Sequence, residues 1–154
     1  MPGIKEKYEA LKKKYSLPAY DDINKDFDIE SIDENSQLVL QKARANMVEK
    51  LDYYAKLIES ILQPESNLSN LYEAHYITDD DKNDAYSLFK RLMRLVRYSN
   101  SVSLTNGEEE NAKFIKEAYQ EYNGLRKDIL KHIIRLMNLW EKETDIKDDQ
   151  NYFG

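Results

Sequence analysis

The clearest structural signal in the chain lies between Ile115 and Trp140, where residues 115–140 read IKEAYQEYNGLRKDILKHIIRLMNLW. The apolar residues recur at steps of three and four, the spacing that places side chains on one face of an α-helix. Gly124 interrupts the segment, but the apolar phase continues through it, so we expect one long helix. The seam consists of Ile115, Ala118, Tyr122, Leu125, Ile129, Ile133, Leu136 and Trp140.

The rest of the chain shows the same helical spacing almost throughout. We expect a short first helix from residue 4 to Tyr15, ended by Pro18, and another short helix over residues 67–76. Three long helices should begin at capping boxes, in which two side chains satisfy free backbone N–H groups at a helix start. These boxes are Ser31–Glu34, Thr78–Asp81 and Thr105–Glu108. The long helix that begins at the Ser31 box should run to about Gln63.

Residues 16–33 form an acidic connector in which we expect at most one helical turn, around Ile23 and Phe27. No run alternates with period two for more than a few residues, so no strand is expected. The sequence therefore predicts an all-α fold, an antiparallel bundle of three long helices plus two short helices. We expect residues 1–143 to form a single helical-bundle domain and residues 144–154 to form an acidic, mobile tail.

The overall charge excludes a global attraction to polyanions. The chain has 29 acidic against 23 basic residues and a net charge of -6, so binding to nucleic acid or anionic lipid would have to be local. Cysteine is absent, which excludes disulfides and thiolate metal sites. No segment approaches the ~20 apolar residues of a membrane span, and no signal peptide is evident. These features predict a cytoplasmic protein without membrane association.

The motifs of common enzyme classes are absent. There is no glycine-rich phosphate loop, no G-x-S-x-G and no Glu-x-x-His pair, so we expect no enzymatic activity, no cofactor and no metal site. Residues 22–33 imitate a calcium loop, but Phe27 stands where that loop needs Gly, and Asp33 stands at its bidentate Glu. Glu73 and His75 are the one candidate acid–base pair, for which a structural role is the favoured interpretation.

Residues 89–100 read FKRLMRLVRYSN and gather four cations in an acidic protein. On a helical wheel these cations lie opposite the apolar arc, so they should face solvent. A second outward stripe of cations follows on the last long helix. The candidate residues for binding a partner or nucleic acid are Lys90, Arg91, Arg94, Arg97, Lys127, Lys131 and Arg135.

A structural interpretation of this basic face is favoured over binding. A turn at Asn106-Gly107 should fold the last two helices into an antiparallel hairpin, in which residues whose numbers sum to about 210 lie side by side. Arg91 and Arg94 would then lie level with Glu117 and Glu121, and Lys127 and Lys131 level with residues 79–84. Such exposed ion pairs orient a hairpin while adding only ~0–1 kcal/mol each.

The last long helix has an apolar arc of about 180°, because Leu130, Ile134 and Met137 extend its seam. This helix is therefore either central in the bundle or the seam of a homodimer. We expect a non-enzymatic protein–protein interaction module, an adaptor or the small subunit of a cytoplasmic complex, with a protein partner. The alternative is a nucleic-acid or ribonucleoprotein accessory factor that binds through the basic face of the last two helices.

Overall fold

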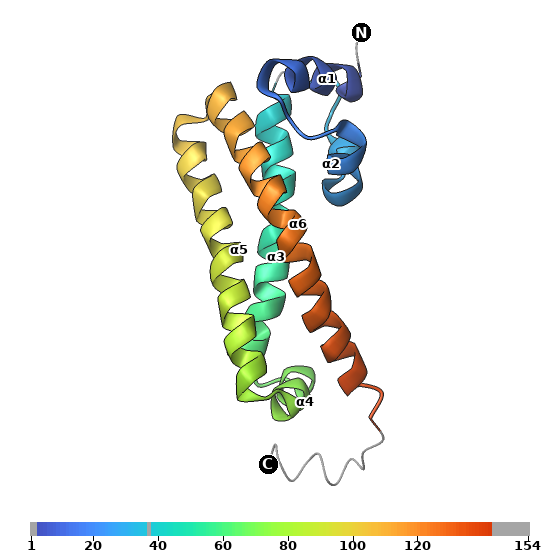
Figure 1. The fold of residues 1–154 in the computed structure, drawn as a ribbon, viewed down its shortest axis with the longest axis vertical. Coiled ribbons are helices and arrows are strands. Elements are labelled where there is room, and N and C mark those ends of the chain that lie inside the picture. The colour runs from blue at the N-terminus through green and yellow to red at the C-terminus, as the bar shows by residue number, and fades with distance from the viewer. Residues whose placement is uncertain (1–2, 37, 143–154) are drawn as a thin grey trace. The chain divides into compact units, whose positions relative to one another are not determined.

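The computed structural model describes residues 3–36 and 38–142, and Figure 1 shows their arrangement within each part of the chain. All regular structure in these ranges is helical, which confirms the all-α class. The elements are α1 (Ile4–Tyr15), α2 (Tyr20–Phe27), the 3-10 turn η1 (Ile29–Ser31), α3 (Val39–Leu62), α4 (Leu68–Tyr76), α5 (Asp79–Thr105) and α6 (Glu108–Leu139). Within the described ranges, none of these helices is long and apolar enough to cross a membrane.

The chain forms two compact units, each with its own core. Unit 1 comprises Met1–Asp52 and Arg94–Gly124, and unit 2 comprises Tyr53–Met93 and Leu125–Gly154. Each of the helices α3, α5 and α6 has one segment in unit 1 and another in unit 2. The single domain over residues 1–143 stays a prediction, and the predicted tail at 144–154 lies outside the described residues.

In unit 1, the acidic connector is more ordered than the sequence predicted, since it forms α2 and η1. The helices α1 and α2 contact each other and η1. The buried Tyr8 hydroxyl donates to the Pro18 carbonyl at 2.6 Å, and the Tyr8 ring meets Tyr20 edge-on at 5.7 Å. Phe27 packs against Tyr122 of α6 with ring centroids 4.9 Å apart. These aromatic contacts support a second helical turn in the connector, and the described residues contain three short α-helices rather than two.

In unit 2, α4 is fixed against the end of α6. The Tyr72 ring stacks on Trp140 with centroids 4.4 Å apart, and its hydroxyl donates to the Leu139 carbonyl. The Trp140 indole N–H donates to the Glu73 carboxylate at 3.0 Å. These contacts fix α4 to the last residue of α6 and to the tryptophan that follows it.

The helix start predicted at Thr78 is confirmed. The Asp81 N–H donates to the Thr78 hydroxyl oxygen, and the Thr78 N–H donates to the Asp81 carboxylate, both at 3.2 Å. This reciprocal pair is a capping box at the first turn of α5.

The capping boxes predicted at Ser31 and Thr105 are wrong, although α6 does begin at Glu108, directly after the predicted Asn106-Gly107 turn. Helix α3 begins only at Val39, because Ser31 closes η1 and donates its hydroxyl proton to the Asp28 carbonyl at 2.7 Å. Thr105 is the last residue of α5, and its hydroxyl donates to the Val102 carbonyl at 3.3 Å. The turn into α6 follows at Asn106, whose left-handed φ of 53° ends the helix.

The apolar seam of α6 lies where the sequence predicted, and the helix runs unbroken through Gly124. Ile133 is half-buried, whereas Trp140 at the end of the seam is 51% exposed. The buried members are Ile115, Ala118, Tyr122, Leu125, Ile129 and Leu136.

Candidate functional site

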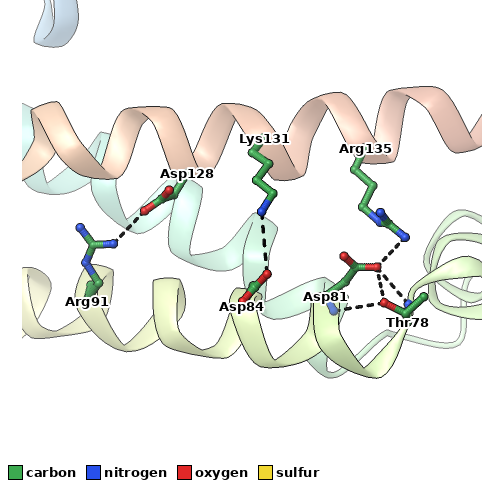
Figure 2. Close-up of polar contacts among 7 residues, drawn as sticks. All are labelled: Thr78, Asp81, Asp84, Arg91, Asp128, Lys131 and Arg135. Atoms are coloured by element: carbon green, nitrogen blue, oxygen red, sulfur yellow. Dashed lines mark hydrogen bonds and ion pairs between the residues drawn. The ribbon is translucent and has the colours of Figure 1, made fainter.

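In unit 2, three of the predicted basic residues form ion pairs between α5 and α6. Figure 2 shows the three ion pairs one after another along two antiparallel helix segments, and we call each pair a rung. The pairs are Arg91–Asp128 at 2.8 Å, Lys131–Asp84 at 3.8 Å and Arg135–Asp81 at 2.5 Å. The predicted placement of Lys131 level with residues 79–84 is confirmed. The cations of these rungs hold two helices of this chain together.

In unit 1, Arg94 pairs with Glu121 of α6 at 3.5 Å, as the sequence predicted. The predicted place of Arg91 beside Glu117 and Glu121 is wrong, since Arg91 pairs with Asp128 in unit 2. The residue numbers of these two observed pairs sum to 215 and 219, whereas the predicted register gave about 210. The turn itself lies at Asn106 and Gly107, as predicted. The difference arises because a sum of 210 centres the hairpin on Thr105, which is the last residue of α5 rather than part of the turn.

Tyr98 occupies the place beside Glu117. Burial, together with its hydrogen bond to the Glu117 carboxylate, raises the pKa of Tyr98 to about 12. The Tyr98 ring meets Phe114 edge-on at 5.0 Å, so the residue joins the core of unit 1 to its polar surface. Glu117 therefore accepts from a phenol instead of pairing with Arg91.

Asp81 takes part both in the capping box with Thr78 and in the ion pair with Arg135. Its side chain is only 16% exposed, and burial alone would raise its pKa. The hydrogen bonds from Thr78, followed by the charges of Arg135 and His132, outweigh that effect and lower the pKa of Asp81 below its ordinary value. The Asp81 carboxylate is therefore held ionised between α5 and α6. The Arg135 Nε is buried and has no hydrogen-bond partner among the described residues.

His132 is buried and lines a pocket of about 210 Å³. Four residues of the ion pairs line the same pocket: Asp84, Arg91, Asp128 and Lys131. Desolvation, followed by the charge of Lys131, lowers its pKa, while the carboxylates of Asp84, Asp81 and Asp128 act in the opposite direction. The imidazole is therefore neutral near pH 7. This environment is that of a core histidine.

Three of the predicted cations form no ion pair within the described part of the chain. Lys90 Nζ lies 5.3 Å from the centroid of the Tyr86 ring, and Arg97 donates to the Asn100 side chain at 2.9 Å. Lys127 is exposed on α6. Among the described residues, the seven predicted cations are therefore divided between four that form internal ion pairs and three that do not.

The second half of α6 carries an exposed apolar surface that the sequence predicted as a broad arc. We call its four large side chains the α6 strip, and each is between 43% and 54% exposed. Its members are Leu130, Ile134, Met137 and Trp140. Central burial of this arc, one of the two alternatives from the sequence, is wrong for these four residues.

An open pocket of about 360 Å³ adjoins the α6 strip. Its floor includes Ile134 and Leu139, and three cations from α6 and the residues after it surround it. Lys142 Nζ lies 4.2 Å from the centroid of the Tyr76 ring, which closes one side. The lining residues are Tyr76, Lys131, Ile134, Arg135, Asn138, Leu139 and Lys142. The pocket combines an apolar floor with a cationic border.

Sequence reasoning missed a polar cluster in unit 1 around Arg44. The Arg44 Nε donates to Asn111 at 2.6 Å, and Nη1 donates to the Ser99 hydroxyl at 2.7 Å. Nη2 donates to Asn106 at 3.4 Å, and desolvation lowers the pKa of the guanidinium. Arg44 lies four residues after Leu40, in phase with the buried seam of α3. An arginine at a core-facing position of a helix was the signal from which a buried polar cluster could have been predicted.

The candidate acid–base pair on α4 is engaged in packing contacts. Glu73 accepts the indole proton of Trp140, and the His75 ring meets Tyr76 edge-on at 4.7 Å. Residues 20–27 form the helix α2, so the calcium-loop pattern does not adopt a loop there. Among the residues described, no group of three or more His, Asp or Glu side chains is placed to hold a metal ion.

The chain matches no protein-family model, and comparisons with curated proteins and with solved structures likewise find no match. The all-α class alone indicates no function, because helical bundles carry many unrelated functions.

Proposed function

We propose that this protein is a non-enzymatic interaction module, an adaptor or the small subunit of a cytoplasmic complex, that binds a protein partner through the α6 strip. The observation that supports this function is the exposure of four large apolar side chains along the end of α6 and the residue after it, Leu130, Ile134, Met137 and Trp140. Contiguous apolar patches on a protein surface mark interaction sites more often than isolated exposed residues do.

The expected strength of this interaction is moderate. Fully burying a Leu, Ile or Met side chain stabilises by about 1.5–3 kcal/mol, so covering an exposed half contributes about 1 kcal/mol. The α6 strip supplies only a few such contributions, which must also offset the loss of translational and rotational freedom. We therefore expect a reversible complex that gains further stability from charges around the strip.

We also infer that α3, α5 and α6 pack as one antiparallel three-helix bundle, with the short helices at its sides. Each long helix continues from one unit into the other, which supports this arrangement. Because the chain has no cysteine, spin labels can be attached to one introduced cysteine in each unit. A narrow distance distribution between the labels is expected, and a broad one would contradict a single bundle.

The alternative proposal, binding of nucleic acid or a ribonucleoprotein, has support from Lys90, Arg97 and Lys127. These three cations have no carboxylate partner among the described residues. The alternative is weaker, because ion pairs with this chain's own carboxylates reduce the charge that Arg91, Arg94, Lys131 and Arg135 can offer to phosphates.

A native pull-down with the full chain, run with and without nuclease, tests the two proposals against each other. A stoichiometric protein that survives nuclease treatment is the expected result. Recovery of nucleic acid alone, or loss of all bound material on nuclease treatment, would favour the alternative and contradict the interaction module.

A further inference from the structure

We infer that the occupant of the α6 strip is an acidic amphipathic helix of a partner protein, with apolar residues facing the strip and carboxylates facing Lys127, Lys131 and Lys142. This inference rests on the proposed function and specifies the chemistry of its partner. The surface involved lies entirely in unit 2.

The shape of the apolar surface favours a helical occupant. Leu130, Ile134 and Met137 are spaced by four and three residues, so their side chains form one row along α6. A partner helix that lies along such a row contributes anchors at the same spacing. The pocket of about 360 Å³ beside Ile134 provides space for one larger apolar anchor.

The charge of the border favours an acidic occupant. Lys131 is 71% exposed and lies 3.8 Å from Asp84, which leaves most of its ammonium group in water. Lys127 is exposed without an ion pair in the described ranges, and Lys142 lies over the Tyr76 ring. Carboxylates of a partner would approach three ammonium groups on one flank of the row, which speeds association and fixes the orientation.

The same charges disfavour a second copy of this chain as the occupant. In an isologous antiparallel pair of α6 helices centred near Ile134, the same flank of each helix faces its equivalent. Lys127 of one copy would then lie opposite Glu141 and Lys142 of the other, and Lys131 opposite Met137 and Asn138, so one carboxylate faces the three lysines of that flank. Like charges placed opposite each other across an interface disfavour that pairing.

A nucleic acid is disfavoured by the centre of the surface. Phosphate recognition needs hydrogen-bond donors and cations along the whole contact. Here the middle of the surface is formed by Leu130, Ile134 and Met137, which would be covered by phosphates without any polar contact. An acidic protein helix satisfies both the apolar row and the cationic flank.

The test uses the full chain and a synthetic peptide probe. The probe is a fluorescein-labelled amphipathic helix with Leu at steps of three and four, Glu at the flanking positions, and no Trp or Tyr. Its matched control has the same Leu positions and Lys in place of each Glu. Binding is followed by anisotropy and, with unlabelled peptide, by the emission of Trp140, the one tryptophan of the chain.

We expect the acidic probe to bind with a Kd of about 1–50 μM and the basic control to bind at least about tenfold more weakly. Raising the salt concentration should weaken the acidic probe more than the control. The substitution Ile134→Glu should reduce affinity for the acidic probe at least about tenfold, and Met137→Gln should reduce it less. Leu104→Glu, at a residue that is 88% exposed on α5 in unit 1, should change affinity less than about twofold.

Several results would overturn the inference. Equal or tighter binding of the basic control would contradict the charge assignment, and a single-stranded oligonucleotide that outcompetes the acidic probe would show a polyanion site. Concentration-dependent dimerisation that is lost in Ile134→Glu would identify a second copy as the occupant. Probe binding only after removal of residues 144–154 would identify the chain's own C-terminal segment as the occupant.

Failure of this inference is separable from failure of the proposed function. If the acidic probe does not bind but the native pull-down recovers a nuclease-resistant protein through the α6 strip, the function stands and the partner has different chemistry. If neither the probe nor any protein binds, the interaction module itself is contradicted.

Discussion

The Arg135 guanidinium lies 2.5 Å from the Asp81 carboxylate, and the same carboxylate caps the first turn of α5 through Thr78. A residue that the sequence offered as a nucleic-acid ligand is thus part of the structural connection between α5 and α6. The Arg135 side chain lies against the Asp81 carboxylate, which is consistent with the low exposure of the Asp81 side chain, 16%.

The capping box at Thr78 should contribute measurably to stability. Thr78→Ala removes the hydroxyl acceptor of the Asp81 N–H, and losing an N-cap typically costs about 1 kcal/mol. The matched control is Thr105→Ala, since Thr105 ends α5 instead of capping α6. Urea unfolding should show a loss of about 1 kcal/mol for Thr78→Ala and less than about 0.5 kcal/mol for Thr105→Ala. The reverse order would contradict the assigned helix boundaries.

These three capping patterns show how far the sequence could predict the fold. The hydrogen bonds of the capping box join Thr78 and Asp81, which are only three residues apart, so the local pattern was sufficient. Ser31 follows the same pattern, but its hydroxyl donates to the Asp28 carbonyl. The Asn46 side chain donates to both Ser31 and the Asp28 carbonyl, and it lies 15 and 18 residues further along the chain. Contacts of that separation are not visible in a local pattern.

The candidate site was predictable in part for the same reason. The burial phase of α6 follows from periodicity alone, and so does the exposure of the cations. The partner of Arg91 depends on the register of the α5–α6 pairing, which the position of the turn alone does not fix to within one helical turn. Arg44 gathers Ser99 and Asn111 from two other helices, so no single segment could indicate the cluster.

Stability should decrease as the pH falls below about 6.5, because burial lowers the pKa of His132 from that ordinary value. The unfolded chain then binds a proton that the folded chain does not, so folding becomes less favourable as protons become available. His132→Gln should flatten the dependence of the urea midpoint between about pH 7 and pH 5. An unchanged slope in that variant would show that other groups are responsible.

A second acid-sensitive step should come from Asp81, whose pKa lies below its ordinary value of 3.8. The stability that ionised Asp81 contributes is fully present above that value and is lost as the pH falls through its lower folded pKa. Asp81→Asn should reduce stability at neutral pH and remove this part of the loss at low pH. A variant that loses stability in acid just as the native chain does would contradict the assignment.

The Arg44 cluster should be more important for stability than the exposed cations. Arg44→Leu leaves Ser99 and Asn111, both buried, without their guanidinium donor, and an unsatisfied buried polar group costs about 1–3 kcal/mol. Lys42→Ala, at an exposed position on the same helix, is the control and should change the free energy of unfolding by less than about 0.5 kcal/mol. A cost below about 0.5 kcal/mol for Arg44→Leu would contradict a structural role.

The Arg91–Asp128 rung should contribute little to stability. Both side chains are about half exposed, and exposed pairs typically contribute 0–1 kcal/mol, so a double-mutant cycle with Arg91→Ala and Asp128→Ala should give a coupling energy below about 1 kcal/mol. The coupling should also decrease at high salt. A coupling above about 2 kcal/mol would show that the rung is desolvated rather than exposed.

The most informative experiment is a quantitative native pull-down under nuclease with the full chain and two variants, Ile134→Glu on the α6 strip and Leu104→Glu on α5. Circular dichroism and the unfolding midpoint would first establish that both variants fold. The account predicts that the native chain and Leu104→Glu recover the same stoichiometric protein and that Ile134→Glu loses it. Equal recovery by all three chains, or recovery of nothing that survives nuclease, would contradict a protein-binding role for the exposed face of α6.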